Sequence, residues 1–328
     1  MNTKSNRRSF LKKSAAAALS APLVMSLEEY ALAGQGSAAA PSAAAPSARA
    51  TLPTGAIGNV KVSRLICGGN LINGYAHSRD LIYVSSLLQH YFTEEKIMQT
   101  WSLCEQHGIN AMLLHTGEAK AVSLYEKYRA QGGRIQFLAQ ITPEKSDLKT
   151  DVQRARDAGA VGAFLGGNNS DAWTREEGMK LIGQFLSNVK AQGMVAGIAA
   201  HELRTVKTIE KAGLAPDFYM KTLHDTNYWS TRRPDQLQEV IDNYGVDNYW
   251  CMDPKETIAF MSELERPWIA YKVLAAGAIN PRAGFKHAFE NGADFAAVGM
   301  FDFQIAEDVA VANAVLKTTQ NRDRSWHG

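Results

Sequence analysis

The sequence of 328 residues lacks the features of a disulfide scaffold, a nucleic-acid-binding protein or a disordered chain. Three cysteines are too few for a disulfide framework, and their odd number implies at least one free thiol. The 35 Lys and Arg nearly balance the 33 Asp and Glu, so a net charge of +2 provides no broad field to attract phosphates. Because 45% of the residues are hydrophobic, a folded core is expected, in one large domain or two.

Two compact catalytic or cofactor-binding motifs are also missing. Gly68-Gly69-Asn70 follows the first apolar run, but it lacks the second half of a G-x-G-x-x-G dinucleotide fingerprint. This argues against an open, doubly wound sheet. The H-E-x-x-H zinc motif does not occur either.

The first 33 residues have the pattern of an export signal. Ser5–Lys13 reads S-N-R-R-S-F-L-K-K, a weakly apolar stretch spans Ser14–Leu27, and Ala31-Leu32-Ala33 has the small-x-small pattern of a cleavage site. Paired arginines before Phe-Leu-Lys resemble a twin-arginine signal. The apolar stretch is shorter than the roughly 20 residues of a spanning helix, so no stable membrane anchor is expected. We therefore expect delivery by the twin-arginine machinery to the periplasm or beyond.

Residues 34–50 are almost entirely Ala, Ser, Pro and Gly, a composition typical of a disordered spacer. Residues 1–33 carry five basic and two acidic residues, a net +3, so the chain without them has a net charge near −1. The remaining residues 51–328 number about 280, close to the roughly 250 of a single barrel domain.

From residue 59 onward, short apolar runs alternate with amphipathic stretches, which predicts a single-domain α/β protein with a (β/α)₈ TIM barrel. The expected strands are Arg64–Gly68, Ala111–Leu114, Ile135–Ile141, Ala160–Leu165, Met194–Ala200, Asp217–Thr222, Trp268–Leu274 and Phe295–Met300. The expected helices are Glu94–His107, Ala119–Gln131, Ser146–Ala158, Thr174–Gln192, Leu203–Ala212, Pro254–Glu263, Pro281–Asn291 and Ile305–Leu316. Glycines at 108, 132, 159, 193, 213 and 292 are expected to end helices. Gly166-Gly167-Asn168-Asn169 is expected to form a tight turn.

The segments Thr54–Gly69, Gly108–Asn110, Trp268–Ile279 and Val298–Asp308 resemble the aldo/keto reductase superfamily. The resemblance covers most of the chain after the spacer, and it implies the same barrel. The family places an Asp and a Tyr after strand two, a Lys after strand three and a His after strand four. Here those strands end in Leu114-His115-Thr116, Gln140-Ile141-Thr142 and Gly166-Gly167-Asn168. The catalytic tetrad is therefore expected to be missing, and an NAD(P) cofactor is less expected than a metal.

Three histidines follow expected strands, at the end of a barrel where catalytic groups gather. They are His115, His201 and His224, each with a nearby carboxylate: Glu118, Glu202 and Asp225. Imidazoles converging there are suited to Zn²⁺, Mn²⁺ or Fe²⁺, with a carboxylate moving a proton. The alternative is that each histidine caps a strand and bonds to the backbone.

Two lysines interrupt apolar strands. Lys221 and Lys272 must reach the barrel mouth, pair with a carboxylate or lose their charge. A desolvated lysine can act as a base or form a Schiff base with a carbonyl compound. We interpret Lys221 as a catalytic candidate and Lys272 as a substrate-binding candidate, with structural ion pairs as the alternative.

Two long loops, Leu71–Thr93 and Thr226–Asp253, are expected after strands one and six as lids or walls of a substrate site, and they supply further substrate-binding candidates. Asn70, His77, Arg79 and Asp80 are suited to a polyhydroxylated or anionic compound. The ring of Trp229 is suited to stacking on a sugar. Both sets have a plainer interpretation, as a solvated loop and as packing of the loop against the barrel.

The favoured hypothesis is an exported, divalent-metal-dependent barrel enzyme acting on a carbohydrate or related polyol or carbonyl compound, by lyase, hydrolase or isomerase chemistry. One alternative is an aldo/keto-reductase-like NAD(P)-dependent oxidoreductase with displaced catalytic groups. Others are a non-catalytic periplasmic sugar-binding barrel and a lyase that forms a Schiff base on Lys221.

Overall fold

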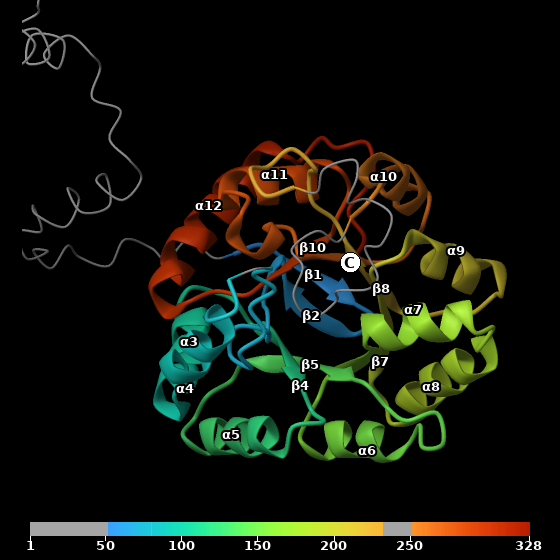
Figure 1. Cartoon of the computed structure of the whole chain (residues 1–328), viewed down its shortest axis with the longest axis horizontal. Helices are drawn as coiled ribbons and strands as arrows, with labels where there is room; N and C mark the ends of the chain where they lie inside the picture. The colour runs from blue at the N-terminus through green and yellow to red at the C-terminus, as the bar shows by residue number, and fades with distance from the viewer. Residues whose placement is uncertain (1–51, 80, 232–250) are drawn as a thin grey trace, which may run out of the picture. The chain divides into compact units, whose positions relative to one another are not determined.

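The computed structural model describes residues 52–79, 81–231 and 251–328. Eight parallel strands close into a barrel in the order β10-β3-β4-β5-β6-β7-β8-β9, and the helices surround it (Figure 1). The strands are β3 (Leu65–Cys67), β4 (Ala111–His115), β5 (Gln136–Ile141), β6 (Gly162–Leu165), β7 (Val195–Ala200), β8 (Phe218–Thr222), β9 (Trp268–Tyr271) and β10 (Phe295–Val298). The predicted (β/α)₈ fold is confirmed.

Most helices after the strands follow the sequence pattern, but a helix at Val84–Tyr91 lies within Leu71–Thr93, which was expected to be a loop. The helices are α3 (Val84–Tyr91), α4 (Glu94–Gln106), α5 (Ala119–Ala130), α6 (Thr150–Asp157), α7 (Gly167–Arg175), α8 (Met179–Ala191), α9 (Leu203–Lys211), α10 (Pro254–Ser262), α11 (Pro281–Glu290) and α12 (Ile305–Thr318), with 3₁₀ turns η3 (Ala275–Gly277) and η4 (Asp302–Gln304). The six glycines predicted to end helices all have positive φ, between 68° and 100°.

Three further local predictions are wrong. The expected turn at Gly166–Asn169 is instead the start of a helix, because Gly166 occupies the N-cap of α7. The expected helix Thr174–Gln192 is two helices, interrupted where Glu177 has a φ of 58°. The strand expected to run to Leu274 ends at Tyr271, since Lys272 has a φ of 60° and cannot continue an extended strand.

Side chains alternate between two apolar layers. One cluster fills the barrel and includes Leu138, Phe164, Phe218, Met220 and Ile269. The other joins the outer faces of the strands to the helices. This alternation decides which residue at each strand end faces the barrel mouth.

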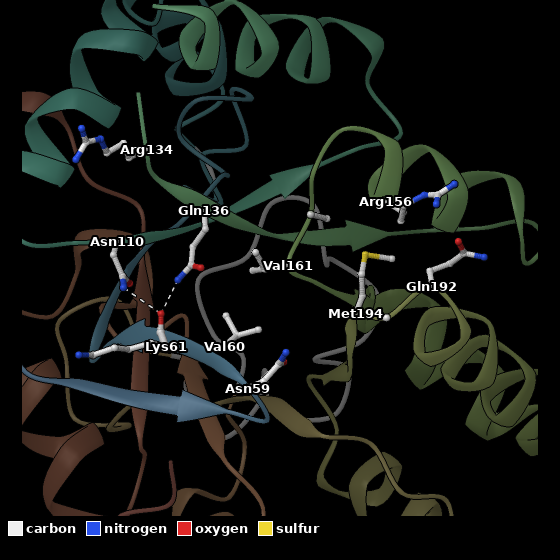
Figure 2. Close-up of a pocket in the computed structure, with 12 residues that line it drawn as sticks. Asn59, Val60, Lys61, Asn110, Arg134, Gln136, Arg156, Val161, Gln192 and Met194 are labelled. Carbon is white, nitrogen blue, oxygen red and sulfur yellow. Dashed lines mark hydrogen bonds between the residues drawn. The ribbon is translucent and has the colours of Figure 1, made fainter. Parts of the chain in front are cut away.

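A two-stranded hairpin, β1 (Thr54–Ile57) and β2 (Val60–Ser63), covers the amino-terminal end of the strands. Its Ile57, Val60 and Val62 join the cluster inside the barrel. Beside it lies a hollow of about 690 Å³, shown in Figure 2. Two amides in its wall, on Asn110 and Gln136, donate to the carbonyl oxygen of Lys61 and so hold the hairpin in place. In TIM barrels this end supports stability rather than catalysis.

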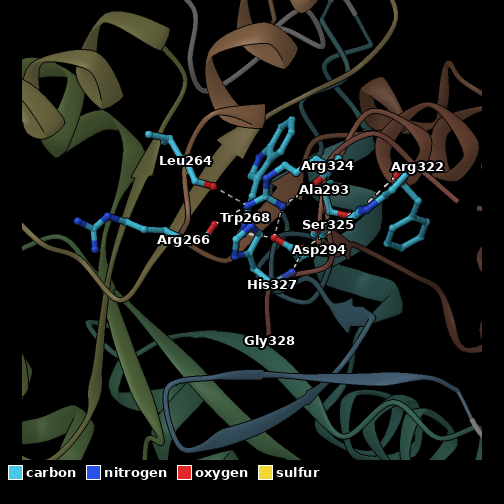
Figure 3. Close-up of polar contacts among 12 residues, drawn as sticks. Leu264, Arg266, Trp268, Ala293, Asp294, Arg322, Arg324, Ser325, His327 and Gly328 are labelled. Atoms are coloured by element: carbon cyan, nitrogen blue, oxygen red, sulfur yellow. Dashed lines mark hydrogen bonds and ion pairs between the residues drawn. The ribbon is translucent and has the colours of Figure 1, made fainter. Parts of the chain in front are cut away.

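The segment after α12 folds back over the same end of the barrel. Figure 3 shows Arg322 and Arg324 meeting the carboxylate of Asp294, which directly precedes β10. Arg64 donates to the carbonyl oxygens of Asp294 and Gly328. These contacts connect the last residues to the barrel strands.

The predicted export signal (1–33) and spacer (34–50) lie outside the described residues. None of the helices within the described ranges is long and apolar enough to span a membrane. Cys67, Cys104 and Cys251 are free and buried.

Candidate functional site

The residues that face the barrel mouth at the carboxyl ends of the strands are unusually polar. Because side chains alternate along a strand, the residue two positions beyond the last apolar residue inside the barrel also points inward, toward the mouth. These residues are His115 (β4), Gln140 (β5), His201 (β7), Thr222 (β8) and Tyr271 (β9), with glycines at 68, 166 and 299 on the other three strands. This is the end at which barrel enzymes carry their chemistry. The mouth is therefore the candidate site.

His201 forms a buried pair with a carboxylate that the sequence did not reveal. Its Nδ1 lies 2.9 Å from Oδ2 of Asp171 on α7. Asp171 is fully buried and also accepts bonds from the backbone N–H of His201 and from the Thr205 hydroxyl, at 3.0 and 2.7 Å. A carboxylate with these donors holds the imidazole with Nδ1 protonated, so Nε2 is its basic nitrogen.

Burial lowers the pKa of His201 to about 4. Asp171 opposes this shift, while the positive charges of Lys272 and Lys221 add to it. The imidazole is therefore neutral at neutral pH, and it lies within electrostatic range of both lysines.

Tyr271 and Gly167 complete the surroundings of His201. The rings of Tyr271 and His201 are 5.6 Å apart. A Cβ atom on Gly167 would lie 2.6 Å from Cε1 of His201 and 2.9 Å from the Tyr271 hydroxyl. The absence of a side chain at Gly167, the first residue of α7, thus leaves the space that the rings of His201 and Tyr271 occupy.

We expect Gly167→Ala to lower the free energy of unfolding by about 1–3 kcal/mol, although alanine favours helices, because the added methyl must displace the rings of His201 and Tyr271. Urea unfolding measures the change. Gly117→Ala is the matched control, since nothing lies within 4 Å of its Cβ position, and it should be nearly neutral. Equal stability of the two variants would contradict the crowding.

Lys272 belongs to a second polar group over the mouth. Its Nζ lies 3.1 Å from Nε2 of His77, and the same nitrogen lies 2.9 Å from Nδ2 of Asn70. Burial lowers the pKa of Lys272 to about 7. Three predicted substrate-binding residues are thus brought together by the structure.

Lys221 lies on the other side of its strand. Its neighbours at alternate positions, Tyr219 and Leu223, belong to the layer between strands and helices. Within the described residues its Nζ donates to the carbonyl oxygen and hydroxyl of Thr222, at 3.0 and 2.7 Å, and forms no ion pair. Burial lowers its pKa. The Lys221 side chain therefore starts on the helix side of its strand, and its amine is held by Thr222.

Among the described residues, the three histidines predicted as metal ligands are not gathered into a metal site. Nδ1 of His224 donates to the carbonyl oxygen of Asp225, and its Nε2 accepts from the backbone N–H of Cys251. Nδ1 of His201 is held by Asp171. No group of three or more His, Cys, Asp or Glu side chains that could hold a metal occurs in the part of the chain that the structure describes. The backbone-bonding alternative describes His224.

The predicted carboxylates lie at the rim. Glu118 is exposed and accepts from the Tyr75 hydroxyl at 3.0 Å, beside the His115 ring. Burial lowers the pKa of His115. Glu202 forms an ion pair with Arg175, and burial raises its pKa. Asp225 is exposed and accepts from the backbone N–H of Asn227.

The remaining substrate-binding candidates are spread around the mouth. Arg79 donates to the carbonyl oxygen of Ser230 and so connects the segments that follow β3 and β8. Trp229 is 84% exposed. Asp80 lies outside the described residues.

Comparisons with known proteins agree with the fold. Two structures of a candidate aldo-keto reductase from Pseudomonas aeruginosa superpose with a TM-score of 0.54, at 16 and 17% identity, over 80 and 83% of this chain and 94 and 100% of theirs. A truncated 3-deoxy-D-arabino-heptulosonate 7-phosphate synthase from Thermotoga maritima gives 0.50, at 10% identity, over 83% and 95%. No protein-family profile and no curated protein matches the sequence. At these identities the likeness shows the barrel alone.

Two members of the site were missed at the level of sequence. Asp171 lies between the expected turn at Gly166–Asn169 and the helix expected to begin at Thr174, so its place on a helix was not predicted. Tyr271 could have been predicted from the sequence, because strict alternation from Ile269 places its side chain inward at the end of the strand.

Proposed function

We propose that the chain is a barrel enzyme that moves a proton at the carbon next to the carbonyl group of a small, sugar-like compound. The observation that supports this is the buried His201–Asp171 pair beside Tyr271 at the carboxyl ends of the strands. A neutral imidazole with an anchored Nδ1–H is suited to accept a proton at Nε2.

In this reaction Nε2 of His201 takes the proton from carbon, and the electron pair moves onto the carbonyl oxygen. The Tyr271 hydroxyl donates to that oxygen as its negative charge develops. Asp171 stabilises the imidazolium that forms, as buried carboxylates do beside catalytic histidines. Return of the proton to the former carbonyl carbon, with the hydroxyl proton of the neighbouring carbon passing to the former carbonyl oxygen, completes an isomerisation. Expulsion of a leaving group from the next carbon, with formation of a C=C bond, gives a lyase instead.

The test is proton exchange in D₂O, followed by ¹H NMR on a panel of trioses, pentoses and hexoses. We expect enzyme-dependent loss of the signal at the carbon next to the carbonyl, slowed by about 100-fold or more in His201→Asn. His90→Asn, on the exposed face of α3, is the matched control and should retain the rate. A panel without exchange above the buffer rate would overturn the proposal and favour a non-catalytic sugar-binding barrel.

A second candidate is an NAD(P)-dependent oxidoreductase, favoured by the resemblance to aldo/keto reductases and by the likeness of the solved structures. It would require catalytic groups away from the family's positions, because His115, Gln140 and Gly166 occupy the ends of β4, β5 and β6. Fluorescence titration with NADPH distinguishes the two, since the proton-transfer enzyme needs no nicotinamide.

Export by the twin-arginine route remains part of the proposal, and it rests on the sequence of residues 1–33. Fusion of this segment to a reporter that folds in the cytoplasm tests it, with Arg7 and Arg8 changed to Lys as the control.

A further inference from the structure

We propose that Lys272 is a covalent catalytic residue that forms an imine with the carbonyl carbon of the substrate. This deepens the proposed function and rests on it, because it assigns the compound handled at the mouth to the aldehydes and ketones. Of the two lysines in the barrel strands, the geometry favours Lys272.

The backbone directs Lys272 to the mouth. Alternation after Tyr271 would turn the next side chain toward the helices, but a φ of 60° breaks the strand at Lys272. Its Nζ meets His77, on the segment after β3, although β10 lies between β9 and β3 in the barrel. The side chain therefore reaches across the carboxyl end of β10.

The partner of Lys272 is held in an equally uncommon conformation. His77 has a φ of 50°, and Asn70 fixes its Nε2 from the other side. Left-handed conformations at residues other than glycine cost of order 1–3 kcal/mol and concentrate at functional sites. Two such residues in direct contact indicate that the position of the Lys272 amine is specified.

The state of the amine agrees with this role. Because burial lowers the pKa of Lys272 to about 7, roughly half of its amine is unprotonated at neutral pH, a fraction roughly a thousandfold above that of an exposed lysine. Desolvated lysines of this kind form Schiff bases. Lys221 is less available, since its side chain starts on the helix side of the strand and its amine is held by the carbonyl oxygen and hydroxyl of Thr222.

The step is balanced with groups at the mouth. The Nζ lone pair attacks the carbonyl carbon, and the carbonyl oxygen gains a proton. Transfer of one amine proton to His77 gives a carbinolamine. Its hydroxyl then leaves as water together with a proton returned by His77, so that the C=N bond forms as a protonated imine that keeps the other amine proton. His77, 3.1 Å from Nζ, is placed to carry these protons. His201 then removes the proton from the neighbouring carbon, and the protonated imine takes up the electron pair in place of the carbonyl oxygen, which has left as water. Hydrolysis releases the product and restores the amine.

The experiment is reduction by borohydride in the presence of dihydroxyacetone, on the full chain, with peptide mapping by mass spectrometry. Reduction of the imine adds the mass of dihydroxyacetone less one oxygen atom. We expect Lys272 to be labelled at least about tenfold faster than the exposed Lys120 and Lys211 in the same sample. Lys221→Met should retain the label, whereas Lys272→Arg, which keeps the positive charge, should lose it.

Labelling of Lys272 no faster than of Lys120, or labelling of Lys221 instead, would overturn the assignment. The wild-type map is resolved by site, so this result does not depend on whether any variant folds. Proton exchange that depends on His201 without labelling of Lys272 would refute the imine and leave the proposed function standing. Absence of both would refute the proposed function itself.

Discussion

Replacing Asp294 with asparagine is expected to lower the free energy of unfolding by about 3–5 kcal/mol. The carboxylate is fully buried, and its oxygens lie 2.8 Å from Nη2 of Arg322 and 2.7 Å from Nη1 of Arg324. Both guanidinium side chains are only 2% exposed. Burial lowers the pKa of Arg322 to about 10, and Asp294 opposes that shift. Without the carboxylate, two buried cations remain without their counter-ion.

The same carboxylate also holds the backbone together. It accepts from the N–H groups of Trp268, the first residue of β9, and His327, at 2.9 and 2.8 Å (Figure 3). An asparagine keeps one acceptor oxygen and turns an amide N–H₂ toward an arginine. We therefore expect loss of stability together with loosening of the last residues.

Chemical denaturation measures this effect, and limited proteolysis of the residues after α12 reports the loosening. Asp151→Asn is the matched control, because it removes the same charge from an exposed i,i+3 pair with Arg154. That pair should contribute no more than about 0.5 kcal/mol. A loss below about 1 kcal/mol in Asp294→Asn would contradict the structural role of the buried ion cluster.

The barrel was predictable because each strand and helix carries its own local signal. Apolar runs of strand length and glycines with positive φ recur through the chain, and each of these signals can be recognised from a short stretch of sequence. Helix α7 was missed because Gly166 and Gly167 indicate a turn by propensity. The space that Gly167 leaves for two rings has no local signature.

The site was predictable only in part, for a related reason. The sequence identified His201 from its place after a strand, His77 from the long loop after strand one and Lys272 from its place within an apolar strand, and all three lie at the mouth. The metal hypothesis required knowledge of what each ring nitrogen bonds to. Nδ1 of His201 is fixed by a carboxylate thirty positions earlier, and His224 accepts from Cys251, twenty-seven positions later. These hydrogen-bonded pairs form only when the barrel closes, so the spacing of the residues in the sequence does not reveal them.

Acid is expected to destabilise the protein between about pH 6.5 and pH 4 through His224 and His201. Burial lowers the pKa of each to about 4 from the ordinary value of 6.5. As the pH falls, the unfolded chain takes up these protons first, and the folded chain takes them up only near pH 4. Stability is therefore complete above pH 6.5 and is lost progressively below it, by up to about 3 kcal/mol for each histidine.

His224 allows this effect to be isolated, because its role is structural. Both its ring nitrogens bond to the backbone in the neutral form, so protonation would turn an acceptor into a donor facing the N–H of Cys251. In His224→Asn the loss of stability between pH 7 and pH 4.5 should shrink by about 2–3 kcal/mol relative to the wild type, whatever its stability at pH 7.

Urea unfolding at these two pH values measures the difference. Carboxylates that titrate in the same range contribute equally to the pH dependence of variant and wild type, so their contribution cancels in the comparison. His90→Asn, an exposed histidine on α3, should leave the pH dependence unchanged. If His224→Asn loses as much stability in acid as the wild type, then the folded protein already accommodates the charged imidazole. In that case the bond from Cys251 to Nε2 does not survive in solution.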